Sequence, residues 1–199
     1  MKRLILIAGP SCAGKTTFIS SILARNPELK ELLCIIDPAE WTSLEARQLH
    51  TVDIREINNL VLHYDILEQH TASDYRHIPE LLDGYEDIIV ITLVTSASCL
   101  LLRNTIRLLN CIFDRLFRQT GKIRSGNRKL SRLWKKEKLY LTSGISRKFY
   151  ENWISHIDSF TMIKHLVFET SGISLNHGLL LNQVNTKYLD KRPAELQLP

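Results

Sequence analysis

The sequence lacks the features that mark several large classes of protein. It has no continuous apolar run near the ~20 residues that a membrane-spanning helix needs, so we expect no membrane span. Its four cysteines include no C-x-x-C pair and are too sparse for a disulfide scaffold, so we expect free thiols in a reducing cytoplasm. Neither an internal repeat nor a low-complexity tract is present. These absences leave a globular, cytoplasmic chain as the expectation.

The length and composition suit one domain. The chain has 199 residues, 44% of them hydrophobic, which is enough for a sizeable core. We expect a single domain over residues 1–190 and a flexible tail over residues 191–199, where Pro193 and Pro199 stand.

Charge is unevenly distributed along the chain, whose net charge is +5. Residues 103–148 hold 14 Lys and Arg against two acids, a net charge of +12, so the remainder carries −7. We expect this segment to form a basic helical insertion, or lid, that faces an anionic partner. The polar stretch 120–130, with its two glycines, favours a lid loop. A solvated basic surface is the alternative.

Apolar runs alternate with helix-like stretches. Runs without two-residue alternation predict buried parallel strands at 3–8, 33–37, 59–64, 87–93 and 165–169. Helical spacing predicts helices at about 15–25, 43–50, 66–72, 96–119, 129–138, 146–157 and 174–190. This order predicts an α/β fold, a three-layer α/β/α sandwich around a five-stranded parallel sheet. Ligands of such sheets bind at the carboxyl ends of the strands.

The first predicted strand leads directly into a phosphate-binding pattern. Residues 9–16 read G-x-x-x-x-G-K-[ST] and are followed at once by a predicted helix. Gly9 and Gly14 let the backbone curl so that its N–H groups face an anion, and the helix start adds the positive end of its dipole. The expected nucleotide-binding residues are Gly9, Pro10, Ser11, Cys12, Ala13, Gly14, Lys15, Thr16 and Thr17.

Charged and hydroxyl side chains near this loop have expected catalytic roles. Lys15 is expected to reach the β- and γ-phosphates, and the Thr16 hydroxyl to hold Mg²⁺. Asp65, at the end of a predicted strand, is expected to orient the same ion or accept a proton from a substrate hydroxyl. Asp37 is a second candidate for acceptor binding. Helix N-capping is the alternative for both aspartates, and Pro38 favours it at Asp37.

Two further groups complete the candidate site. Arg103 and Arg107 are four residues apart on a predicted helix, so they share a face and could neutralise charge on a transferred group. An ordinary solvated basic face is the alternative. Thr170, Ser171 and Gly172 follow the last predicted strand and are expected to present backbone groups to a nucleotide base. A simple strand-to-helix turn is equally compatible with that stretch.

With these residues the chain resembles the P-loop nucleoside triphosphate hydrolase superfamily, in its branch of small nucleotide and metabolite kinases. The resemblance rests on the 9–17 loop, the strand ending at Asp65, the helix with Arg103 and Arg107, and the stretch 170–172. It implies ATP and Mg²⁺ as cofactors. The Arg- and Gly-rich substrate loop of guanylate kinases is missing after the first predicted helix, and there is no Asn/Thr-Lys-x-Asp base signature of GTPases.

Three functions are compatible with these observations. The first is ATP- and Mg²⁺-dependent phosphoryl transfer to a small acceptor, with an anionic acceptor among the options. The second is a sulfotransferase-like reaction with a phosphoadenosine sulfate donor, which the intact Gly-Lys-Thr triplet disfavours because that triplet suits a triphosphate and metal. The third is a nucleic-acid-binding NTPase, with the basic segment as its electrostatic footprint.

Overall fold

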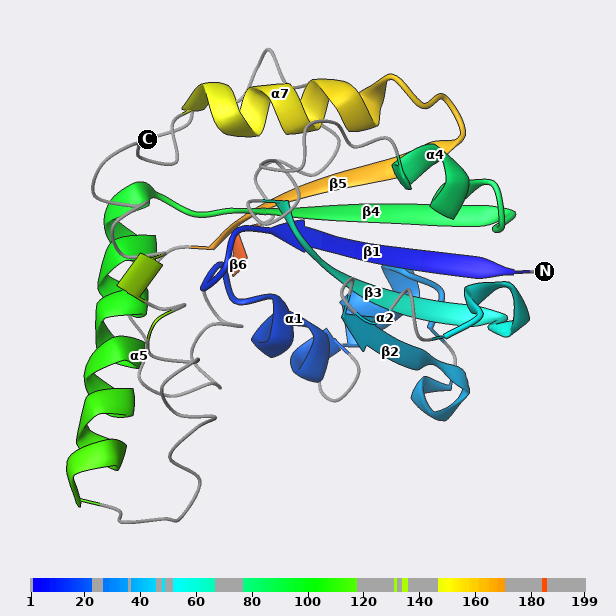
Figure 1. Cartoon of the computed structure of the whole chain (residues 1–199). Coiled ribbons are helices and arrows are strands. Elements are labelled where there is room, and N and C mark those ends of the chain that lie inside the picture. Colours follow the sequence, from blue (N-terminus) through cyan, green and yellow to red (C-terminus); the bar gives the residue numbers. More distant parts are fainter. Residues whose placement is uncertain are drawn as a thin grey trace.

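A computed structural model describes residues 2–22, 27–35, 37–45, 48, 52–66, 77–117, 131, 134–135, 147–170 and 184–185. Its centre is a sheet of six strands in the order β2-β3-β1-β4-β5-β6 (Figure 1). The strands are β1 (Arg3–Gly9), β2 (Thr42–Glu45), β3 (Asn59–Asp65), β4 (Asp87–Val94), β5 (Ile163–Thr170) and β6 (Val184–Asn185). The pairs from β2 to β5 are parallel, and β6 is antiparallel to β5.

The chain reverses its direction of travel across the sheet at the edge strand β2. From β1 it crosses to β2 at one edge and returns to β3, and it then passes over to β4 and β5 on the other side of β1. A right-handed crossover places its helix on a face set by the direction of travel, so the two halves place helices on opposite faces. The connection that leaves β1 therefore lies on the opposite face from those that leave its neighbours β3 and β4, and ligands of open α/β sheets bind outside the carboxyl ends of strands at such a point.

Helices cover both faces of the sheet, as Figure 1 shows. On one face lie α1 (Lys15–Ile22) and α2 (Pro27–Leu32), and on the other lie α4 (His77–Leu82) and α7 (Arg147–Asp158). Phe18 of α1 packs on Phe168 of β5, with ring centroids 5.3 Å apart. On the opposite face Trp153 of α7 stacks on Tyr64 of β3 at 5.2 Å. The parts of the chain that the structure describes therefore form an α/β fold with three layers.

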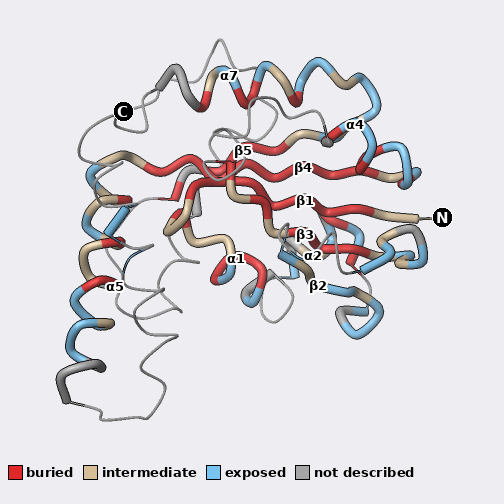
Figure 2. The backbone as a smooth tube through the Cα atoms, viewed as in Figure 1, coloured by how far each residue is buried: buried red, intermediate tan, exposed pale blue. Residues whose placement is uncertain are grey.

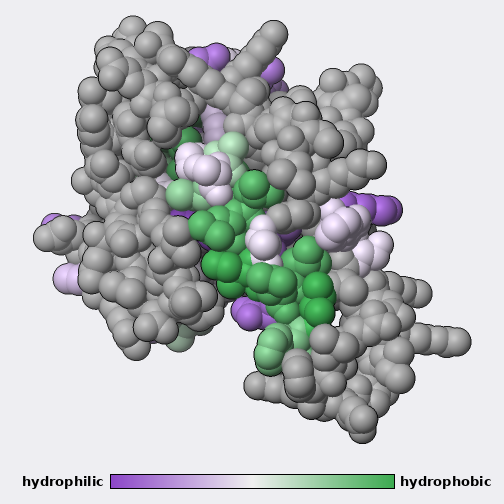
Figure 3. Space-filling view, turned by 90° about the vertical axis from the view of Figure 1, so that its left-hand side faces the viewer, coloured by the Kyte–Doolittle hydropathy of each residue, from purple (hydrophilic) through white to green (hydrophobic). Residues whose placement is uncertain are grey.

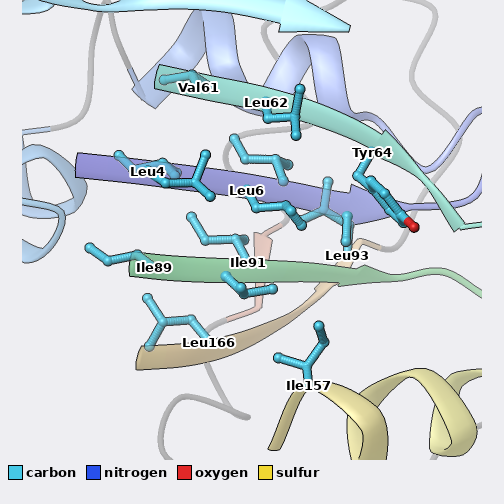
Figure 4. Close-up of a cluster of buried hydrophobic side chains, with 14 of the residues drawn as sticks. Leu4, Leu6, Val61, Leu62, Tyr64, Ile89, Ile91, Leu93, Ile157 and Leu166 are labelled. Carbon is cyan, nitrogen blue, oxygen red and sulfur yellow. The ribbon is translucent and has the colours of Figure 1, made fainter. Parts of the chain in front are cut away.

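The core follows the central strands. β1 and β4 are buried over nearly their whole length and β3 over its middle, as the red segments of the tube in Figure 2 show. Figure 4 shows apolar side chains from neighbouring strands in contact, with Ile157 of α7 closing one side. Strands covered on both faces carry apolar residues on both, which is why these runs lack alternation.

Helix α5 (Ala97–Phe117) stands at the carboxyl ends of the strands and forms one side of the molecule. Leu100, Asn104 and Leu108 are buried, as expected for one helical face repeating every four residues. The exposed hydrophobic side chains of this helix are Leu102, Leu109, Ile112 and Phe113. Figure 3, which faces this side, shows hydrophobic atoms gathered across it. No helix within the described residues is long and apolar enough to cross a membrane.

The predicted strands at 3–8, 59–64, 87–93 and 165–169 are confirmed as β1, β3, β4 and β5. The predicted strand at 33–37 is wrong at residues 33–35 and 37, which form no strand. There α2 ends in a turn in which the Cys34 N–H donates to Glu31 O at 3.0 Å and the Ile35 N–H donates to Lys30 O at 2.8 Å. These two bonds, with Cys34 at φ 51°, are the Schellman pattern of a helix end.

The second strand lies where a helix was expected. The prediction of a helix over 43–50 is wrong at residues 43–45, which belong to β2 and pair in parallel with β3. This edge strand is mostly exposed, so its sequence, TSLE, has little of the apolar character used to predict buried strands. The count of parallel strands is as predicted, but the second of them is a different segment.

The helix predictions at 15–25, 96–119 and 146–157 correspond to α1, α5 and α7. The helix predicted at 174–190 is wrong at residues 184–185, which form β6. Residues 131, 134 and 135 of the predicted 129–138 helix are helical, as is residue 66 of the predicted 66–72 helix. The predicted lid loop at 120–130 and the tail at 191–199 lie outside the described residues.

Candidate phosphate-binding site

The phosphate-binding pattern forms a curled loop between the end of β1 and the start of α1. Two of its residues have positive φ, Cys12 at 68° and Gly14 at 94°. Glycine adopts such angles without strain, whereas a side chain there costs about 1–2 kcal/mol. A bond from the Ala13 N–H to Pro10 O, 3.2 Å long, closes the turn within the loop.

Gly9 starts the loop at a point where backbone segments are close. A Cβ atom at this position would lie 3.1 Å from Leu93 O and 3.2 Å from Ala13 Cβ. Both contacts are shorter than ordinary van der Waals distances. A side chain at the first glycine of the pattern would therefore need β4 or the loop to shift by a few tenths of an ångström.

The side chain of Lys15 folds back over the loop. Its Nζ donates to Gly9 O at 2.6 Å and to Pro10 O at 2.8 Å. Anionic oxygens are stronger acceptors for an ammonium group than neutral carbonyls are. A phosphate chain in the loop would therefore compete well for Lys15, which already points to the place where such a chain would lie.

Two arginines of α5 reach the middle of the loop. Arg103 Nη1 donates to Cys12 O at 3.2 Å, and Arg107 Nη1 lies 3.3 Å from Cys12 Sγ. Both contacts go to one loop residue, so the prediction that these arginines share a helix face is confirmed. Burial lowers the pKa of the half-buried Arg103, although guanidinium groups stay charged at neutral pH. Two positive charges thus stand beside the loop.

The carboxyl end of β3 brings an aspartate to the start of the loop. Asp65 is the register partner of Gly9 in the pairing of β1 with β3. Tyr64 faces α7, and side chains alternate along a strand, so Asp65 lies on the face that carries α1. The Thr16 hydroxyl is on an exposed residue of the first turn of α1.

Magnesium suits this combination of groups. Mg²⁺ in nucleotide sites takes one or two protein oxygens and completes its shell with phosphate oxygens and water. Thr16 and Asp65 supply oxygens of that type on the side of the sheet where the loop lies. Within the described residues no group of three or more His, Cys, Asp and Glu side chains is arranged to hold a metal by itself.

A second polar group near the loop was not among the predicted site residues. His63 Nε2 lies 3.0 Å from Ser43 Oγ, and Glu45 is the register partner of His63. Burial lowers the pKa of His63, the Glu45 carboxylate raises it, and the Lys15 ammonium lowers it further. Ser43 and Glu45 could be found only once β2 was placed, because nothing in the local sequence marks that strand.

Asp37 is not brought to the loop. Its Oδ1 accepts the Ala39 N–H at 2.9 Å, which is the N-cap geometry of the short 3₁₀ helix η1 (Pro38–Glu40). Cys34 O and the Trp41 ring both contact Arg3, which begins β1. The loop is at the other end of that seven-residue strand, roughly 20 Å away at ~3.3 Å per residue.

Thr170 lies behind the loop rather than at its open side. Its side chain is buried, and its hydroxyl donates to Ala13 O at 3.0 Å. Ser171 and Gly172 lie outside the described residues, so their expected role at a nucleotide base stays a prediction.

Comparison of the chain with protein-family models, with curated proteins and with solved structures gave no match in any of the three. The functional argument therefore depends on the geometry of the loop and its neighbours.

Proposed function

We propose that this chain binds ATP with Mg²⁺ at the 9–17 loop and transfers the γ-phosphoryl group to a small acceptor. The observation that carries the proposal is the position of Lys15. Its Nζ lies over a curled glycine loop, within hydrogen-bond distance of Gly9 O and Pro10 O, at the carboxyl end of the central strand β1. A lysine in this place binds the β- and γ-phosphates of a nucleotide.

The neighbours of the loop support transfer of a phosphoryl group. Arg103 and Arg107 supply positive charge beside Cys12, where negative charge on the phosphates must be neutralised. Asp65 beside Gly9 suits the placement of the magnesium ion or the acceptance of a proton from an acceptor hydroxyl. In the transfer itself the acceptor oxygen bonds to the γ-phosphorus while the bond to the bridging oxygen breaks and ADP leaves.

Thermal unfolding with a ligand panel tests the donor site. We expect ATP to raise the midpoint of thermal unfolding in a Mg²⁺-dependent way. We expect no comparable rise with adenosine 3′,5′-bisphosphate. A ligand at 100 times its Kd adds about 2.7 kcal/mol of stability, which corresponds to roughly 5–10 °C for a chain of this size. Lys15→Ala should remove the rise, because it removes the cation that lies over the loop.

Lys164→Ala is the matched control, since Lys164 is an exposed residue near the start of β5, at the opposite end of the sheet from the loop. Equal ATP responses in the two variants would contradict the donor site. A metal-independent response to the bisphosphate alone would favour the sulfotransferase-like reaction. ADP formation that depends on an added acceptor then separates a kinase from a simple NTPase.

A further inference from the structure

A chain of buried hydroxyl groups connects α7 with the back of the phosphate loop. The Tyr150 hydroxyl donates to Thr95 O and accepts from the Thr95 N–H, both at 3.1 Å. Thr95 Oγ1 bonds to Thr170 Oγ1, and Thr170 Oγ1 reaches Ala13 O at 3.0 Å. The exposed fractions of Tyr150, Thr95 and Thr170 are 3%, 1% and 2%. The chain is therefore closed to solvent.

The shortest contacts fit one order of donors along this chain, with Val94 O at 3.5 Å as a longer second acceptor for Thr170. Ala13 O accepts, so the Thr170 proton goes to it. Thr170 Oγ1 then accepts the proton of Thr95, and the Tyr150 proton goes to Thr95 O. Burial raises the pKa of Tyr150, so its hydroxyl keeps its proton at neutral pH. In this order all three hydroxyls donate, and those of Thr170 and Tyr150 also accept, from Thr95 Oγ1 and the Thr95 N–H.

Holding the Ala13 carbonyl also orients the next amide. A peptide unit is planar and trans, so its C=O and N–H point in opposite directions. With Ala13 O directed at Thr170, the Gly14 N–H points away from it. Gly14 has φ 94°, which glycine alone adopts without strain. Because glycine is conformationally permissive, Gly14 itself does little to fix the orientation of the Ala13–Gly14 peptide.

We propose that Thr170 is a positioning residue for the phosphate loop: backed by Thr95 and Tyr150, it fixes the Ala13–Gly14 peptide so that the Gly14 N–H faces a bound phosphate. The effect of this role on ATP binding rests on the proposed function. It also makes α7 part of the support of the loop, although α7 is remote from it in sequence.

Thr170→Val and Thr170→Ser form the test pair. Valine has the shape of threonine without its hydroxyl, whereas serine keeps the hydroxyl. We expect the Kd for ATP with Mg²⁺ to rise about tenfold in the valine variant, equivalent to about 1.4 kcal/mol, and to stay within about twofold in the serine variant. Both are measured by calorimetry at a temperature where circular dichroism shows the native fold. An unchanged Kd in folded Thr170→Val overturns the proposal.

A second variant covers the case in which Thr170→Val does not fold. Tyr150→Phe removes only the hydroxyl that anchors Thr95, one residue further from the loop. We expect a Kd increase of about threefold, smaller than in Thr170→Val because the Thr170 bond to Ala13 O remains. A Kd equal to that of the wild type overturns the proposal in this arm.

A measurement without nucleotide separates this proposal from the proposed function. The Ala13 amide bonds to Pro10 O inside the loop, so its hydrogen exchange reports opening of the turn. Exchange in Thr170→Val should be about tenfold faster than in Thr170→Ser. If the wild type binds no ATP but this difference is present, the proposed function fails and the positioning role stands. If exchange is equal in the two variants, the positioning role fails.

Discussion

Gly9 lies where its surroundings leave little room for a side chain. Substitution by alanine forces its Cβ against Leu93 O and Ala13 Cβ. Overpacking of this kind costs about 1–3 kcal/mol. The result is a lower free energy of unfolding or a displaced loop. Gly9→Ala should therefore lower the unfolding midpoint, weaken ATP binding, or both, as chemical denaturation and calorimetry will measure.

Gly84→Ala is the control for this substitution. The nearest atom to a Cβ at Gly84 is Leu81 O at 3.8 Å, an ordinary contact distance. Its effect should stay within about 0.5 kcal/mol, as for most surface substitutions. Similar behaviour of the two alanine variants would contradict the close packing of the loop against β4.

For single residues, the sequence predicts site residues that belong to a contiguous motif. It misses residues that reach the site only through contacts between distant parts of the chain. The loop residues from Gly9 to Thr17 could be found because the pattern is contiguous. Thr95 and Tyr150 could not, because their contacts to each other cross 55 residues of sequence. Asp37 is an equally good candidate for acceptor binding and for helix N-capping in the sequence, and in the structure its carboxylate caps a short helix.

Among the elements, α2 shows why apolar runs are ambiguous. The run from Leu33 to Ile35 has the composition of a buried strand, and Leu33 and Ile35 are indeed buried. A short apolar run fits a buried helix end as well, and periodicity cannot separate the two. Here the six-residue helix before it and the positive φ of Cys34 decide the structure.

The end of α2 gives a prediction of its own. Cys34 occupies the position after a helix where glycine is strongly preferred, because φ is 51°. Cys34→Gly should raise the free energy of unfolding by roughly 0.5–1 kcal/mol, after the greater chain entropy of glycine is subtracted. The midpoint should rise by about 2–4 °C per kcal/mol. Cys34→Ala removes the thiol but keeps the Cβ, so a gain of equal size in that variant would contradict the explanation.

Across the whole molecule, the parallel pairing of β3, β1, β4 and β5 brings the site residues together at the carboxyl ends of the strands. The loop follows β1, Asp65 ends β3, Thr95 follows β4 and Thr170 ends β5. The sequence predicted parallel strands and ligand binding at their carboxyl ends. It did not predict the order β2-β3-β1-β4-β5, because local patterns specify which segments are strands but not which strands are neighbours.

The most direct measurement of the central claim is an NMR titration of the loop amides with ATP and Mg²⁺. If the curled backbone holds a polyphosphate, the amide resonances of Gly14 and Lys15 should move in a saturable, Mg²⁺-dependent way, because their N–H groups become donors to phosphate oxygens. Loop amides that stay unmoved at saturating nucleotide, with changes confined to other parts of the chain, would contradict the account.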